Sequence, residues 1–124
     1  MLDFIRVAAA VPPVAVANPA QNALHCIQMA QEAEKNSPQL VVFPELCLTG
    51  YTCGDLFFQQ ALLTGAKAAL TQVVAASKGL QAVLAVGLPL KIGGELYNCA
   101  VILHRGKVYG VVPKTYIPTY NEFY

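Results

Sequence analysis

Charged side chains are scarce in this chain of 124 residues. Only 12% of the residues are charged and 56% are apolar, whereas ordinary globular domains contain about 25% charged residues. The eight basic and seven acidic residues leave a net charge of +1, which gives no field that would attract nucleic acid or an anionic membrane. So few charges do not cover the surface of a free monomer. We therefore expect a fragment, or a subunit of a homo-oligomer, with large faces covered by other protein.

A membrane-spanning segment is also absent from the sequence. Such a helix needs about 20 consecutive, predominantly apolar residues, and the longest uncharged stretch, 7–31, is interrupted by prolines, amides and a histidine. A signal peptide is a poor match, because Asp3 precedes the apolar run and Pro12 and Pro13 lie within it. We expect a cytoplasmic protein that binds neither a membrane nor nucleic acid.

The sequence lacks metal-binding and phosphate-binding motifs. It contains no C-x-x-C pair and no zinc-site spacing, and it has no Gly-x-Gly-x-x-Gly or Walker sequence. In a cytoplasmic protein the thiols are expected to be reduced. We expect no metal and no cofactor in this chain. The four cysteines are Cys26, Cys47, Cys53 and Cys99.

Apolar periodicity predicts an α/β fold in one domain over residues 1–124. Asn18 is suited to cap a helix that starts at Pro19, and Pro38 ends that helix because the residue before a proline avoids the helical region. A second helix is expected over about 59–77. The first strand is expected to be buried on both faces. The expected strands cover residues 4–10, 39–43, 82–90, 96–104 and 108–112.

Two charged residues come directly after apolar strands. Glu45 follows Pro44 and Lys114 follows Pro113. Ligand sites of α/β sheets lie at the carboxyl ends of strands, and a carboxylate there is expected to be partly withdrawn from solvent, which suits a general base. Each residue also has an ordinary structural interpretation: a helix cap or rim ion pair for Glu45, and a solvated loop lysine for Lys114. Their similar positions favour one shared site.

Two segments carry a resemblance to a known family. The first is FPELCLTGY at 43–51, followed by Asp55-Leu56-Phe57, and the second is PKTYIPTYNEFY at 113–124. Both are similar to the nitrilase, or carbon–nitrogen hydrolase, superfamily, and within it to the glutamine-amidase domain of glutamine-dependent NAD synthetases. The resemblance implies a nitrilase-type α-β-β-α sandwich, of which this chain contains only the first part.

The resemblance also implies a Glu-Lys-Cys triad. Glu45 matches the general base, and Lys114 matches the lysine that stabilises the tetrahedral intermediate. Glu122 matches a second glutamate, which holds the lysine and the substrate end of the site, and Tyr51 matches an aromatic residue near bound glutamine. The family's nucleophilic cysteine stands downstream of the position of Glu122. We therefore expect no nucleophile among the four cysteines here, and no activity from this chain alone.

The activity implied by the resemblance belongs to a longer parent protein. That protein hydrolyses glutamine and passes the ammonia to a separate synthetase domain, which uses ATP and magnesium to amidate deamido-NAD. The partners expected for this chain are thus glutamine and the remainder of the parent protein. Two alternatives stay open: a nitrilase-type amidase with another amide substrate, and a non-catalytic module for assembly or small-ligand binding.

Overall fold

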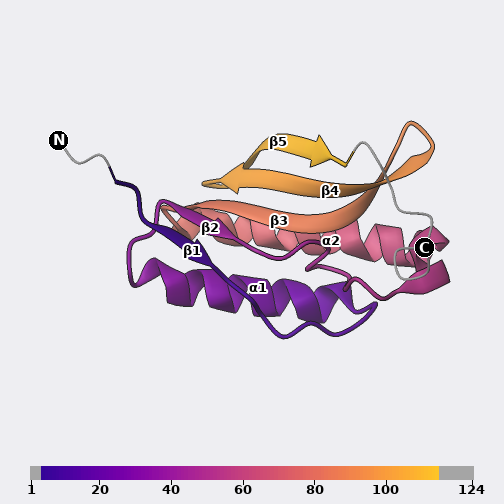
Figure 1. The fold of residues 1–124 in the computed structure, drawn as a ribbon, viewed down its shortest axis with the longest axis horizontal. Helices are drawn as coiled ribbons and strands as arrows, with labels where there is room; N and C mark the ends of the chain where they lie inside the picture. The colour runs from indigo at the N-terminus through magenta and orange to yellow at the C-terminus, as the bar shows by residue number, and fades with distance from the viewer. Residues whose placement is uncertain (1–3, 115–124) are drawn as a thin grey trace.

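The computed structural model describes residues 4–114, in which five strands form one sheet in the order β1-β2-β3-β4-β5. The first three strands are parallel, and β4 and β5 continue the sheet as antiparallel neighbours. Figure 1 shows the antiparallel strands at the yellow and orange end of the chain. The strands are β1 (Val7–Ala9), β2 (Leu40–Val42), β3 (Val83–Ile92), β4 (Glu95–His104) and β5 (Lys107–Pro113).

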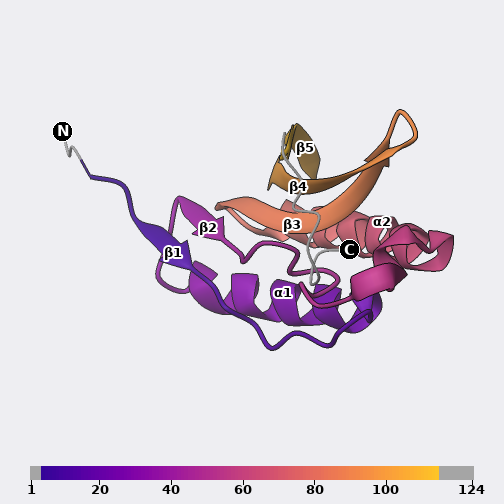
Figure 2. The same ribbon diagram turned by 45° about the vertical axis from the view of Figure 1, so that its right-hand side comes forward.

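Two long helices cover one face of this sheet, as Figure 2 shows from the side. The first, α1 (Pro19–Glu34), starts where predicted: the Asn18 side chain accepts a hydrogen bond from the Gln21 N–H, and proline occupies the first turn. The second, α2 (Gln60–Ala76), lies beside α1. No helix within residues 4–114 is long and apolar enough to cross a membrane.

The core lies between the helices and the sheet. Alternate residues of the central strands point toward the helices, as the twofold period of a strand requires, and Leu84, Val86 and Val101 are each no more than 1% exposed. Small side chains line the facing sides of the helices, which brings the helix backbones close to the sheet. These helix residues are Ala23, Cys26 and Ala30 in α1 and Ala66, Ala69 and Val73 in α2.

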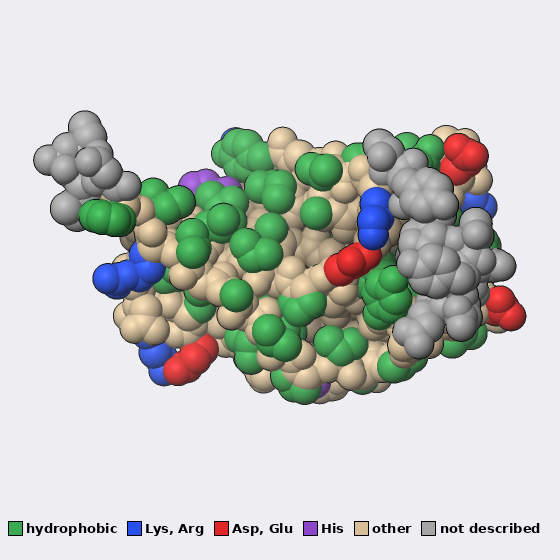
Figure 3. All heavy atoms as spheres, in the orientation of Figure 1, with side chains coloured by type: hydrophobic (Ala, Val, Ile, Leu, Met, Phe, Trp, Pro, Cys, Tyr) green, Lys and Arg blue, Asp and Glu red, His purple; other side chains and the backbone are tan. Residues whose placement is uncertain are grey.

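The opposite face of the sheet is apolar and carries no second layer within the described residues. Val42 of β2 pairs with Ala85 of β3, and Ala100 of β4 pairs with Val112 of β5, so these four side chains share that face. Val42, Ala100 and Val112 are exposed. Figure 3 shows hydrophobic side chains spread over much of the surface in view. We call the face of the sheet that carries Val42, Ala85, Ala100 and Val112 the open face.

The α/β fold and the order of its elements are confirmed, whereas the first strand differs from the prediction. Only Val7–Ala9 pairs with β2, and Phe4 is 84% exposed. The expectation that this strand is buried on both faces is wrong for the described residues. The physical reason is that β1 lies at an edge of the sheet and helices cover one face alone.

We predict that the 124-residue chain on its own self-associates, because an apolar face of this width in water binds other apolar surfaces. The Val112→Lys substitution on the open face is expected to shift the population toward monomer, measured by sedimentation velocity. Leu24→Lys, at an exposed side chain of α1, is the matched control and is expected to leave the mass distribution unchanged. A wild-type chain that is monomeric at high concentration would contradict the prediction.

Candidate functional site

A tight turn after β2 places Glu45 at the open face. The turn is closed by hydrogen bonds from the Cys47 N–H to the Pro44 carbonyl and from the Gly50 N–H to the Leu46 carbonyl, at 3.2 and 2.7 Å. Leu46 has a positive φ of 55° and a fully buried side chain. Burial of Leu46 therefore anchors the turn, while Glu45 beside it stays at the surface.

The turn crosses β3 at Gly87, and the absence of a side chain there makes the crossing possible. A Cβ at Gly87 would lie 2.5 Å from the Leu46 nitrogen and 2.9 Å from the Pro44 carbonyl oxygen. The Gly87 carbonyl in turn accepts a hydrogen bond from the Leu48 N–H at 3.1 Å. The backbone of the turn that carries Glu45 therefore packs directly against the backbone of β3 at Gly87.

Lys114 approaches Glu45 from β5, at the opposite edge of the sheet. It directly follows β5, and its N–H donates to the Asn98 carbonyl of β4 at 2.8 Å. Because Cys99 pairs with Pro113, Asn98 and Lys114 stand opposite each other across the two strands. Opposed residues of an antiparallel pair point to the same face, so both side chains lie on the open face.

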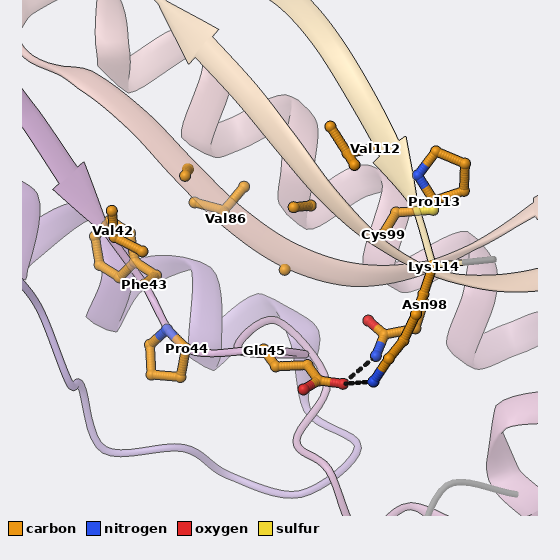
Figure 4. Close-up of a pocket in the computed structure, with 13 residues that line it drawn as sticks. Val42, Phe43, Pro44, Glu45, Val86, Asn98, Cys99, Val112, Pro113 and Lys114 are labelled. Atoms are coloured by element: carbon orange, nitrogen blue, oxygen red, sulfur yellow. Dashed lines mark hydrogen bonds and ion pairs between the residues drawn. The ribbon is translucent and has the colours of Figure 1, made fainter. Parts of the chain in front are cut away.

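The three side chains meet at one carboxylate oxygen, as Figure 4 shows. Lys114 Nζ lies 3.3 Å from Glu45 Oε1, and Asn98 Nδ2 donates a hydrogen bond to the same oxygen. The Glu45 and Lys114 side chains are 46% and 47% exposed, whereas Asn98 is 6% exposed. The two residues predicted to share a site are therefore in contact, although 69 positions separate them.

A cavity of about 380 Å³ opens beside this cluster. Its volume falls in the range of roughly 300–1,000 Å³ that is typical of small-molecule sites. Glu45, Asn98 and Lys114 supply its polar groups, and the rest of the lining is largely apolar. The apolar part includes Val42, Ala85, Gly87, Ala100 and Val112. A few convergent polar groups in an apolar hollow are able to orient a small ligand.

Glu45 is partly withdrawn from solvent, as expected. Almost half of its side chain is exposed, because the open face has no covering layer within residues 4–114. Both oppositely charged groups border the same hollow. The arrangement can therefore hold a proton acceptor and a cation next to one bound molecule, and a covering layer would strengthen both electrostatic effects by excluding water.

Of the two other predicted site residues, the structure describes only Tyr51. Tyr51 lies in the exposed segment after the turn and does not line the cavity. Glu122 lies outside the described residues. Asn98 was not among the predicted site residues. The signal that could have drawn attention to it is the single amide within the predicted strand 96–104, whereas its position opposite Lys114 comes from the observed register.

All four thiols are buried in the structure. The Cys26 thiol donates to Cys47 Sγ at 3.9 Å, and this hydrogen bond together with burial raises the pKa of Cys26. The same bond lowers the pKa of Cys47, which also accepts from the Gly87 N–H in the core. Burial raises the pKa of Cys53 and of Cys99. Cys99 follows Asn98 in β4, so its side chain points away from the open face.

No group of three metal-ligating side chains gathers anywhere in residues 4–114. The two histidines have partners of another kind. His25 Nδ1 lies 2.8 Å from the Pro13 carbonyl, and His104 Nε2 lies 3.0 Å from the Gln81 carbonyl. Both imidazoles therefore tie loops to neighbouring elements.

The sequence and this geometry match one family of known proteins. A model of the family described as carbon-nitrogen hydrolase matches residues 6–123, almost the full length of the chain. The chain belongs to the carbon–nitrogen hydrolase family. The matched range includes Glu45, Asn98 and Lys114.

Relatives of this carbon–nitrogen hydrolase chain include glutamine-dependent NAD(+) synthetases. The protein of that name from Mycobacterium tuberculosis is 46% identical over 98% of the chain, and the one from Mycobacterium leprae is 41% identical over the same share. Our chain spans 18% of the length of each. It is therefore similar to a small part of these proteins.

Solved structures give the same result for the carbon–nitrogen hydrolase fold. A glutamine-dependent NAD+ synthetase from Acinetobacter baumannii, in complex with adenosine diphosphate, superposes with a TM-score of 0.85 at 30% identity, covering 96% of our chain and 22% of that one. The enzyme from Cytophaga hutchinsonii gives a TM-score of 0.84 at 27% identity, over 93% of our chain and 20% of that one. The nitrilase-type fold is thereby confirmed.

We predict that Gly87→Ala destabilises the protein by about 1–3 kcal/mol, the usual cost of forcing an extra methyl group into a packed site. The added Cβ would press on the backbone of the turn rather than on a flexible side chain. Urea unfolding of the protein measures the effect. Gly110→Ala in β5 is the control, because its Cβ would meet open space. Equal stability of the two variants would contradict the close crossing at Gly87.

Proposed function

We propose that this chain is the N-terminal portion of the glutamine-amidase domain of a glutamine-dependent NAD synthetase. The observation that carries the proposal is the contact of Glu45 with Lys114 beside an apolar cavity, in a carbon–nitrogen hydrolase chain. The similarity to NAD synthetases over 98% of the chain supports this choice of substrate and parent protein. The remainder of the parent protein covers the open face and completes the sandwich.

In the proposed reaction, Glu45 acts as general base toward a cysteine nucleophile from the remainder of the protein. The thiol proton passes to the Glu45 carboxylate while the sulfur attacks the carboxamide carbon of glutamine. The carbonyl oxygen becomes an oxyanion, and the Lys114 ammonium stabilises it at close range. The Glu45 carboxyl then returns the proton to the leaving nitrogen, so that ammonia departs and a thioester remains.

Water completes the cycle at the same carboxylate. Glu45 takes a proton from water, whose oxygen attacks the thioester, and the expelled thiolate recovers that proton as glutamate leaves. The ammonia passes to the synthetase domain, which uses ATP and magnesium to amidate deamido-NAD. Glu122 is proposed to hold Lys114 and the substrate end of the site, and Tyr51 to lie near bound glutamine. We also propose that the parent protein is a cytoplasmic homo-oligomer.

We predict that Glu45→Gln in the full-length protein lowers glutamine hydrolysis by about 10²–10⁴-fold, which is the usual contribution of general acid–base catalysis. Lys114→Met is expected to lower it by about 10²–10³-fold, through loss of oxyanion stabilisation. Glutamate release measures glutamine hydrolysis, and NAD formation from added ammonium measures the synthetase reaction separately.

Three outcomes decide between the candidate functions. Loss of glutamate release with intact ammonium-supported NAD formation supports the amidase assignment. Hydrolysis of another amide in preference to glutamine would support the alternative that the protein is a nitrilase-type amidase with a different substrate. The matched control is Lys67→Met, at an exposed residue of α2, which is expected to keep full activity. Full activity of Glu45→Gln would leave the chain as a non-catalytic module.

We further predict that the purified 124-residue chain releases no glutamate from glutamine. The physical reason is that its four thiols serve as small buried side chains, while the proposed nucleophile belongs to the remainder of the protein. An assay of glutamate release with and without a thiol-blocking reagent tests this. Turnover that requires a free thiol and disappears in Glu45→Ala would show that this chain carries its own nucleophile.

A further inference from the structure

We propose that Asn98 is a positioning residue for Glu45: together with Lys114 it occupies Oε1 and leaves Oε2 as the atom that accepts the proton. This inference rests on the proposed function and goes beyond it, because it assigns a role to a residue outside the Glu-Lys-Cys triad and to one oxygen of the base. Three features of the structure support it.

The first feature is the convergence of two donors on one oxygen. Asn98 Nδ2 and Lys114 Nζ both point at Glu45 Oε1 (Figure 4). A carboxylate oxygen has about two lone pairs for hydrogen bonds, so two donors use the capacity of Oε1. Among residues 4–114, no side chain or N–H donates to Oε2. With respect to the described part of the chain, Oε2 thus keeps its lone pairs available and is the oxygen proposed to receive the proton.

The second feature is how firmly Asn98 is held. Its side chain is 6% exposed, and its carbonyl accepts the Lys114 N–H at 2.8 Å. Asn98 also lies within the long pairing of β4 with β3, opposite Pro89. Asn98 thus bonds the Glu45 carboxylate through its side chain and the Lys114 N–H through its backbone carbonyl. Both groups of the cluster take their position from the same point of β4.

The third feature is the chemistry of the amide itself. An amide donates a hydrogen bond without adding charge, so the Lys114 ammonium stays the single cation at Glu45 among the described residues. A second cation would bind the carboxylate more tightly and weaken it as a base. Rotation of the carboxylate is restrained because two donors, one from β4 and one from the residue that follows β5, both hold Oε1.

The test compares Asn98→Leu and Asn98→Asp in the full-length protein. Loss of a hydrogen bond to a charged group costs about 1.5–3 kcal/mol, which corresponds to roughly a 10- to 100-fold fall in kcat for glutamine hydrolysis. KM for glutamine is expected to change by less than about twofold, because Asn98 bonds the base rather than the substrate. NAD formation from ammonium is expected to stay at the wild-type level.

Asn98→Asp supplies a pH-dependent readout that a merely structural role would not give. At neutral pH the introduced carboxylate cannot donate to Glu45 and repels it, so activity is low. As the pH falls, the introduced carboxyl gains a proton and becomes a donor again. The ratio of variant to wild-type kcat is therefore expected to rise toward lower pH. The matched control is Asn36→Asp, at an exposed residue, whose ratio is expected to be independent of pH.

Each result counts for or against the inference. Wild-type kcat in folded Asn98→Leu and Asn98→Asp variants would overturn it, and so would a change confined to KM. Equal loss of the ammonium-supported reaction would also overturn it, because that pattern indicates a structural role. If Asn98→Leu does not fold, the pH-dependent ratio of Asn98→Asp decides. Absence of glutamine hydrolysis in the wild-type protein would instead overturn the proposed function and this inference with it.

Discussion

The site depends on one close contact between backbones, where the turn after β2 passes over Gly87. Strand β2 is short and ends before the middle of β3, so Glu45 reaches the cavity only because the chain crosses its neighbour there. Any side chain at Gly87 would occupy the space of the Pro44 and Leu46 backbone. The base is therefore held by sheet and turn together, with Leu46 buried beneath it.

Covering the open face would change the chemistry of this cluster. The ion pair is almost half exposed in residues 4–114, and exposed pairs of this kind contribute only about 0–1 kcal/mol to stability. Under a covering layer, the same charges would act in a medium of lower dielectric, where they affect a bound substrate much more strongly. The proposed covering layer would account for both the scarcity of charge in the sequence and the exposure of this pair.

Much of this arrangement was predictable because its signals are local. The Asn18 cap and Pro19 set the start of α1, and the positions of Glu45 and Lys114 after their strands indicated that the two share a site. Asn98 was missed because its role depends on strand register, which decides the partner of a residue and is not written in local sequence. The extent to which Glu45 is exposed depends on which layers surround the sheet, and the apolar periodicity of one strand does not contain that information.

The separation of Glu45 from Lys114 along the chain has a consequence for how the protein is made. Contacts between distant residues form only after the loop between them is closed, at an entropic cost that local contacts avoid. The pair spans 69 positions, and everything from α2 to β5 lies between its members. The helices and the β4–β5 hairpin can therefore form while no cavity exists, and a nascent chain acquires its charged centre only after β5 has docked.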